Sequence, residues 1–243
     1  MTVTWEELGW ERVATGVGRC RLPRWDCTAG LVIGAGTALL IDAGADLAEG
    51  ARLRAEAEEL AGHRVTHLAL THPHFDHVFG AAAFAGAEVF GAVGVETVLA
   101  GRLGRAELRA DAVRNGLDPS PADEAVEVLA SPRHHVSGEW TLDLGDGRQV
   151  LLANVGPGHT AHDLAVLVPG SPEVVFCGDL VEESGEPQAG PDAVPQQWSA
   201  ALDRLLDLGG EDALYVPGHG AVVDAEFVRR QRDALARSFG VSR

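Results

Sequence analysis

The sequence of 243 residues contains no lysine, because all 19 of its basic side chains are arginines. A lysine Schiff base, a lysine general base and a lysine-based phosphate loop are therefore excluded. Acidic side chains number 36, and the resulting net charge of -17 repels phosphate backbones and anionic lipid surfaces. We expect no nucleic-acid partner and no membrane partner, although a local basic groove would override the global sign.

Cysteine is also scarce, with only Cys20, Cys27 and Cys177. Their odd number and the absence of a Cys-x-x-Cys pair indicate three buried thiols rather than disulfides or a thiolate zinc site. No apolar run reaches the roughly 18 residues of a membrane span, since the longest, 29–41, is interrupted by glycines. Residues 1–10 lack the basic start and apolar core of a signal peptide, so we expect a cytoplasmic location.

Short apolar runs alternate with helical stretches along the chain, which indicates an α/β protein. Runs at 29–33 and 38–41 predict a hairpin, 45–61 a helix, and 65–70 a strand. That strand leads directly into the histidine-rich loop 71–77. The second half repeats this outline, and two such halves facing each other would bring their loops to one edge. We therefore expect a four-layer α/β/β/α sandwich with two mixed sheets and outer helices.

We interpret residues 1–243 as a single domain, with a polar helical insert at about 99–135 that Pro119 and Pro121 break. The insert would lie over the site as a lid, or it would present a solvated helix face or a dimer surface. We therefore expect either a monomer or a homodimer. Trp25, in the turn before the first expected hairpin, would form an apolar lip or simply pack. As a lid, the insert would receive an anionic acyl group through its arginines, Arg102, Arg105 and Arg109.

The strongest chemical signal is a set of histidines and aspartates that follow strands. Alternate residues of an extended chain point the same way, so His72 and His74 can converge on one ion. Asp76 and His77 follow a turn and would point to a second ion, and Asp179 can bridge the two. Ligand-type side chains this close together are costly to bury without a cation. The candidate metal ligands are His72, His74, Asp76, His77, His159, Asp179 and His219.

This pattern closely resembles that of the metallo-β-lactamase-fold hydrolase superfamily over nearly the whole chain. The resemblance implies the α/β/β/α sandwich and two metal ions. In order along the chain, the matching residues are Asp42, His72, His74, Asp76, His77, His159, Asp179 and His219.

The resemblance also implies a division of the ligands between the two ions. Asp76 and Asp179 would be the catalytic carboxylates, with Asp179 shared between the ions. Asp42 matches the first motif of the family and would fix the tautomer of a ligand histidine by a hydrogen bond, or else only cap its strand. One ion would bind to His72, His74 and His159, and the other to Asp76, His77 and His219.

Nitrogen and oxygen ligands without thiolate favour zinc, and iron or manganese is compatible. We expect two zinc ions per chain and hydrolysis of an ester, thioester or lactone of a small molecule by metal-bound hydroxide. This chemistry needs no side-chain nucleophile, in agreement with the absence of lysine and of a Gly-x-Ser-x-Gly elbow.

Departures from the known branches narrow the substrate. Glyoxalase II shares the ligand set, but only 24 residues follow His219, where that enzyme carries its glutathione-binding region. Lactonases place a tyrosine where this chain has Glu182, and cysteine-containing β-lactamases lack a histidine at the position of His77. The alternatives are an RNase Z-like phosphodiesterase, an iron-dependent sulfur dioxygenase and a non-enzymatic regulatory domain. The last is least favoured, because no ligand is missing.

Overall fold

The computed structural model describes residues 3–240. Residues 1–2 and 241–243 lie outside the described residues. Both ends of the expected domain 1–243, and the first two residues of the segment in which we find no signal peptide, therefore lie outside them too. The strands are β1 (Trp10–Ala14), β2 (Val17–Leu22), β3 (Cys27–Ile33), β4 (Ala38–Ile41), β5 (His67–Ala69), β6 (Glu88–Ala92), β7 (His134–Val136), β8 (Glu139–Asp143), β9 (Gln149–Asn154), β10 (Leu164–Val168), β11 (Val174–Glu182) and β12 (Leu214–His219). The α-helices are α1 (Leu47–Ala61), α2 (Phe75–Val78), α3 (Glu96–Leu99), α4 (Arg102–Arg114), α5 (Pro119–Glu127), α6 (Pro195–Gly209) and α7 (Ala225–Ser238), with 3-10 turns at Glu6–Leu8 and Ala81–Phe84.

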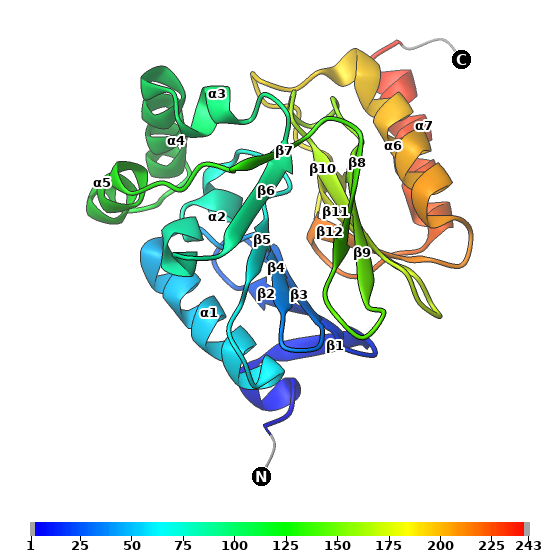
Figure 1. Cartoon of the computed structure of the whole chain (residues 1–243). Helices are drawn as coiled ribbons and strands as arrows, with labels where there is room; N and C mark the ends of the chain where they lie inside the picture. Colours follow the sequence, from blue (N-terminus) through cyan, green and yellow to red (C-terminus); the bar gives the residue numbers. More distant parts are fainter. Residues whose placement is uncertain (1–2, 241–243) are drawn as a thin grey trace.

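Two mixed sheets pack face to face, and helices cover their outer faces (Figure 1). The first sheet runs β1-β2-β3-β4-β5-β6-β7, and the second runs β12-β11-β10-β9-β8. A single residue pair, Cys27 with His219, connects β3 to β12. Helices α1 to α5 lie outside the first sheet, and α6 and α7 lie outside the second. The expected four-layer sandwich is confirmed.

Three clusters of buried apolar side chains separate the four layers. Val32 and Leu152 belong to the cluster between the sheets. Leu53 of α1 belongs to the cluster outside the first sheet, and Trp198 of α6 to the cluster outside the second. Each buried Leu or Val side chain contributes roughly 1.5–3 kcal/mol. Because the central strands are covered on both faces, they occur in the sequence as continuous apolar runs.

The first two strands were missed in the sequence, because arginines interrupt the apolar residues from 10 to 22. Arg19 is nonetheless buried, and its guanidinium donates to the carbonyl of Gly220 at 2.7 Å and to Glu11 at 2.7 Å. Since β2 pairs with β3, Trp25 lies in the turn of that hairpin rather than ahead of the first hairpin.

The expected helical insert is wrong at its C-terminal boundary. His134 and His135 belong to β7, which pairs in parallel with β6. The two prolines also do not break a helix, because Pro119 is the first residue of α5. Proline is favoured at that position, since its missing N–H has no helical partner to lose.

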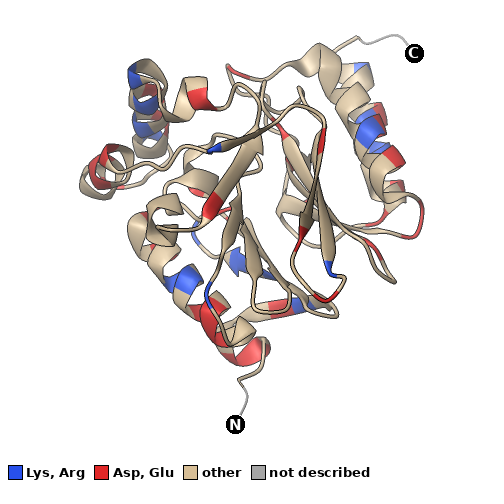
Figure 2. Cartoon of the chain, in the orientation of Figure 1, with Lys and Arg blue, Asp and Glu red and all other residues tan. Residues whose placement is uncertain are grey.

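The helices α1, α4, α5 and α7 carry many of the charged residues (Figure 2).

Among residues 3–240, no helix is both long enough and apolar enough to cross a bilayer.

Candidate metal centre

All seven predicted ligands converge where strands of both sheets end. The loop after β5 carries His72 and His74, and α2 begins at Phe75, directly before Asp76 and His77. The second sheet supplies the rest from the β9–β10 loop, from β11 and from the last residue of β12, which are His159, Asp179 and His219.

The first group consists of His72, His74, His159 and Asp179, and one ligand atom of each lies within 4.8 Å of the others. His159 Nε2 is 2.9 Å from His74 Nδ1 and 3.5 Å from Asp179 Oδ2. His72 Nε2 is also 3.5 Å from Asp179 Oδ2. Ligand atoms at zinc distances around a tetrahedral ion lie about 3.3 Å apart, so the spacing suits one cation.

The second group consists of Asp76, His77 and His219, and it also includes Asp179. His219 Nε2 is 3.2 Å from Asp179 Oδ2 and 3.4 Å from Asp76 Oδ2. His77 Nε2 is 3.2 Å from Asp179 Oδ1 and 3.7 Å from Asp76 Oδ2. These separations again match the edges of a coordination polyhedron. Asp179 is thus the residue common to both groups.

Hydrogen bonds determine which histidine nitrogen faces the cluster. His77 Nδ1 donates to Asp42 Oδ2 at 2.8 Å, and His219 Nδ1 donates to the Trp25 carbonyl at 2.8 Å. Because Nδ1 donates to an acceptor of its own, Nε2 is the nitrogen of each ring that faces the cluster.

His74 is held the other way round. Its Nε2 donates to Asp192 Oδ2 at 3.0 Å, so Nδ1 is the nitrogen that faces His159. For His72, Nδ1 lies 3.0 Å from the Thr71 hydroxyl, which in turn donates to Asp42. In four of the five rings, a hydrogen bond of one nitrogen thereby turns the other nitrogen toward the ligand cluster, as metal ligands require, whereas His159 Nδ1 has no hydrogen-bond partner among the described residues.

Burial and charge divide the histidines into two kinds. Burial lowers the pKa of His72 to about 4 and that of His159 well below its ordinary value, so both rings are neutral near pH 7. Burial also opposes charge on His77 and His219, but the acidic groups around them raise the pKa of both. A divalent cation would replace those two protons, since a ligand nitrogen must be unprotonated.

The ionised forms of Asp76 and Asp179 are likewise stabilised by positive charge. Although burial disfavours their ionised forms, the neighbouring histidines lower the pKa of Asp76 and of Asp179. Asp76 is 8% exposed and Asp179 6%. Within residues 3–240, the buried atoms His72 Nε2 and Asp179 Oδ1 form no hydrogen bond. Such atoms cost about 1–3 kcal/mol each when unpaired, so the residues fit a bound metal.

Comparison with known protein families identifies the chain. A family model described as the metallo-beta-lactamase superfamily matches residues 22–219, which include all seven ligands. The chain belongs to the metallo-beta-lactamase superfamily. Members of this superfamily are metal-dependent hydrolases, which agrees with the geometry of the ligand cluster.

Individual relatives of this superfamily member are distant. Metallo-beta-lactamase domain-containing protein 1 of Xenopus laevis is 28% identical over 163 residues, 64% of this chain and 54% of that protein. The chain therefore spans about half the length of the curated relative it matches. A metallo-beta-lactamase from Pontibacter korlensis has a TM-score of 0.73 at 20% identity, covering 93% of this chain and 97% of its own. The metallo-beta-lactamase FIM-1 from Pseudomonas aeruginosa, in a mono-zinc form, has a TM-score of 0.68 at 20% identity, with 96% of each chain covered. These similarities establish the fold.

Asp42 makes more contacts than its sequence position indicated. Its carboxylate accepts from the Thr71 backbone N–H at 2.8 Å and from the Thr71 hydroxyl at 2.7 Å, besides His77 Nδ1. Its backbone is left-handed, with φ at 59°, a conformation that asparagine tolerates better than alanine.

We expect Asp42→Asn to weaken zinc affinity by about 10- to 100-fold, because the amide group turns a donor toward one of the groups that now donate to the carboxylate. Competition with a chromophoric chelator measures this affinity. Asp46→Asn is the matched control, since Asp46 caps α1 by accepting from Glu49 N–H at 2.8 Å and asparagine caps equally well. Unchanged affinity in Asp42→Asn would show that Asp42 does not position a ligand.

Two glycines in this superfamily member lie where a side chain would crowd the site around Asp179. A Cβ atom at Gly218 would overlap Asp179 Oδ1 and the backbone of Gly178. At Gly178, where φ is 54°, a Cβ would press against the Thr71 side chain. The pairing of β11 with β12 shifts register on either side of Gly178, a bulge of the kind that re-aims side chains at sites.

Two supporting residues, Asp192 and Asp163, were not predicted from the sequence. Asp192 holds His74 from 118 residues further along the chain, and no sequence signal connects the two. Asp163 accepts from the Thr160 N–H at 3.0 Å and from its hydroxyl at 2.7 Å, and so shapes the turn that carries His159. The Thr-x-x-Asp spacing is a signal that would have found it.

Asp163 and the cysteine Cys27 are both buried. Burial raises the pKa of Asp163 to about 7, against the hydrogen bonds from Thr160. Cys27, expected only as a buried thiol, donates to the Asp76 carbonyl at 3.2 Å and lies 3.6 Å from His77 Nε2. Burial raises the pKa of this thiol to about 12, so it packs beside the second group as a neutral side chain.

The ligand cluster opens into a pocket of about 860 Å³. Trp25 lines it, as expected for an apolar lip, with its ring edge-on to Phe75 at 5.2 Å. Its indole Nε1 donates to the Asn115 carbonyl at 3.1 Å, which links the lip to the end of α4. Helix α4 and the loop after β11 form the remaining walls.

The expected role of the insert arginines is wrong. Arg105 donates to the carbonyls of Leu99, Val126 and Leu129, and Arg109 pairs with Asp123 of α5. Neither lines the pocket, and Arg102 is exposed outside it.

Helical spacing explains this error. Residues 102, 105 and 109 share one stripe of α4, whereas the residues of α4 that line the pocket lie on another. The insert does border the site, but Arg105 and Arg109 bind the insert together.

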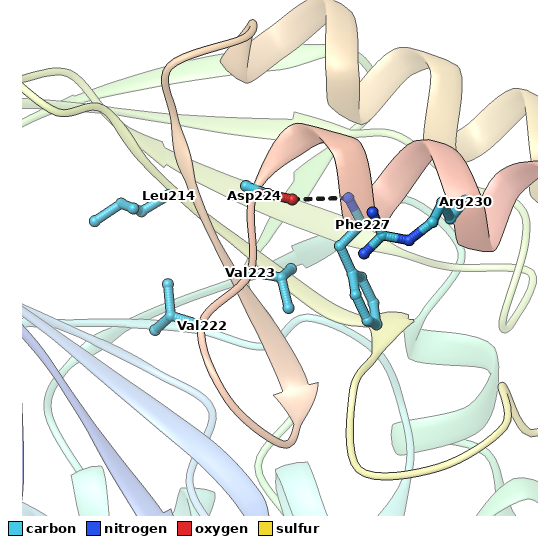
Figure 3. Close-up of a pocket in the computed structure, with 6 residues that line it drawn as sticks. All are labelled: Leu214, Val222, Val223, Asp224, Phe227 and Arg230. Carbon is cyan, nitrogen blue, oxygen red and sulfur yellow. Dashed lines mark hydrogen bonds between the residues drawn. The ribbon is translucent and has the colours of Figure 1, made fainter.

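A second hollow, of about 380 Å³, lies between β12 and the start of α7 (Figure 3). It is lined by Leu214, Val222, Val223, Asp224, Phe227 and Arg230 and contains none of the seven ligands. Its one aspartate caps α7, since Asp224 accepts from the Phe227 N–H at 2.8 Å. The hollow therefore lacks the groups that the chemistry requires.

Proposed function

We propose that the protein hydrolyses an ester, thioester or lactone bond of a small-molecule substrate at a centre of two zinc ions. The observation that supports this most strongly is the pair of ligand groups joined at Asp179, each with atoms at metal-ligand spacing. Iron or manganese would satisfy the same nitrogen and oxygen donors.

The ligand residues divide by group. Zinc bound at both groups would acidify a water molecule and polarise the substrate carbonyl. Asp179 would serve both ions. His72, His74 and His159 would hold one ion, and Asp76, His77 and His219 the other.

The remaining tasks fall to protein groups of the site. Asp76 and Asp179 keep a low pKa, stay anionic and can accept a hydrogen bond that orients the attacking water. Asp42 and Asp192 hold ligand rings in position through His77 and His74. The apolar side chains Trp25 and Phe75 shield part of the pocket from bulk water, which strengthens electrostatic interactions inside it.

We place the chain nearest to the glyoxalase II-like branch, which shares its ligand set as lactonases and RNase Z also do, but specificity for glutathione is not part of the proposal. Glu182 lines the pocket at the position where lactonases carry tyrosine, and it accepts from the Gln188 N–H at 3.3 Å. Lactones stay among the proposed substrates, although this protein lacks the tyrosine hydroxyl that assists the reaction in lactonases.

The zinc-loaded protein should hydrolyse at least one of a thioester, an aryl ester and a lactone with a higher kcat/KM than a phosphodiester or a cephalosporin. Activity should rise with pH through roughly pH 7, where the water in a zinc site ionises. Steady-state kinetics over the five substrate classes measures both. The metal-free protein, which we expect to be inactive, gives the background rate for each substrate.

Two outcomes would replace the proposal with the alternatives. Hydrolysis of phosphodiesters alone would assign the protein to an RNase Z-like class. Oxygen consumption that depends on iron, with oxidised products, would assign it to the dioxygenases.

A further inference from the structure

One face of α4 forms a wall of the substrate pocket. Gly104, Glu107, Leu108, Asp111 and Asn115 line the pocket and recur at three- and four-residue spacing, so they share a face of the helix. Gly104 permits close packing here, because a Cβ would collide with the backbone of Val98. This face therefore presents two carboxylates to whatever occupies the pocket.

The charges on the pocket wall do not cancel. Asp111 is paired with Arg114 at 2.8 Å, and Asp192 accepts from His74 at 3.0 Å. Glu107 is exposed, lines the pocket and has no hydrogen bond or ion pair within residues 3–240. It is the carboxylate of the α4 wall whose charge has no partner among residues 3–240.

Among the arginines near Glu107, Arg114 lines the pocket on the same face of α4, and its guanidinium is paired with Asp111 at 2.8 Å. Arg105 and Arg109 bind the opposite side of the insert, as described above. Arg24 lies over the Trp25 ring, donates to the Gly116 carbonyl and does not line the pocket. Glu182 adds a further carboxylate to the wall, with only a backbone N–H as its donor.

The same pocket contains the ligand cluster. Asp179 lines it, is only 6% exposed and has an Oδ1 atom without a hydrogen bond among the described residues. The face of α4 that carries Glu107 and Asp111 thus borders the same pocket as the candidate metal centre.

We propose that the substrate carries a cationic group, an ammonium or a guanidinium, on the part that lies against α4, and that Glu107 receives it. The inference rests on the proposed function, because it takes the pocket over the ligand cluster as the substrate site. Leu108 and Trp25 provide apolar surface in the same pocket as Glu107, which suits an aliphatic chain between the cation and the scissile carbonyl.

A matched series of substrates tests the proposal. Nitrophenyl esters of aminocaproic acid, heptanoic acid and adipic acid place an ammonium, a methyl and a carboxylate at nearly the same position. We expect kcat/KM for the ammonium ester to exceed that for the carboxylate ester, and the ratio to fall as salt screens the charges. Equal values for the three esters would overturn the proposal.

Charge variants locate the effect. Glu107→Gln should lower the ammonium-to-methyl ratio of kcat/KM by about two- to fivefold, as exposed ion pairs contribute modestly. Glu107→Arg should favour the carboxylate ester instead. Glu127→Gln, an exposed residue of α5 outside the pocket, makes the same charge change and should leave the ratio unaltered. A ratio that Glu107→Gln and Glu107→Arg do not change would refute the role of Glu107.

A binding measurement separates failure of this inference from failure of the proposed function. If the zinc-loaded protein hydrolyses none of the three esters, the proposed function fails for them. Calorimetric titration of that protein with aminocaproate, heptanoate and adipate then still reports the preference of the pocket for charge. Binding of adipate equal to or tighter than that of aminocaproate would overturn the cationic substrate by itself.

Discussion

Replacing Asp179 with alanine should lower kcat/KM by on the order of a thousandfold or more. Asp179 is the residue common to both ligand groups, so its loss removes a ligand of each proposed ion and a low-pKa carboxylate of the pocket. Loss of one donor group to a transition state already costs about 10²–10³ in rate. Steady-state kinetics on the best substrate, with elemental analysis of bound metal, measures the effect.

Two further variants make the result interpretable. Asp179→Asn keeps the size of the side chain and removes its charge, so a loss shared with alanine reflects coordination rather than a cavity. Asp203→Ala breaks a surface pair with Arg232 and should keep full activity. An Asp179→Ala protein that binds two zinc ions and turns over normally would contradict the bridging role.

Removing the metal should lower the midpoint of thermal unfolding by about 8–16 °C. Each proposed ion takes ligands from both sheets, since loop 71–77 belongs to the first and His159, Asp179 and His219 to the second. Free zinc at a thousand times its Kd stabilises the folded state by about 4.1 kcal/mol. For a domain of this size each kcal/mol shifts the midpoint by about 2–4 °C.

Scanning calorimetry before and after exhaustive chelation measures this shift, and added zinc should reverse it. Elemental analysis of the reconstituted protein should give two ions per chain. The Asp179→Ala protein is the control, because it should show a smaller shift. A chelated protein with the same midpoint as the zinc-loaded protein would mean that metal binding and folding are not coupled.

The ligand set could be predicted because its members follow recognisable strands. His72 and His74 lie two apart after one apolar run, and His219 ends another, so local periodicity placed them correctly at one edge. Their role as metal ligands stays a prediction until the metal is measured. The four layers followed from alternating strands and helices, a pattern that burial on both faces imposes.

The supporting contacts could not be predicted, because they join segments without any shared local pattern. Asp192 reaches His74 from a loop rich in proline and glycine, and the geometry of such a loop is decided by tertiary packing. Arg105 illustrates a second limit. Its charge was apparent from the sequence, but its direction depended on which stripe of α4 packs against α5.

The crowding around Asp179 has a consequence for how the sequence tolerates mutation. At Gly218 the Asp179 carboxylate occupies the space that any other side chain would need, and a side chain at Gly178 would meet Thr71 in the same way. A complete substitution scan scored by activity should therefore find these two positions as intolerant as the histidines, although glycine supplies no reactive group. A ranking of positions by the reactive groups of their side chains would miss these two glycines, because their contribution is the space that they leave for neighbouring atoms.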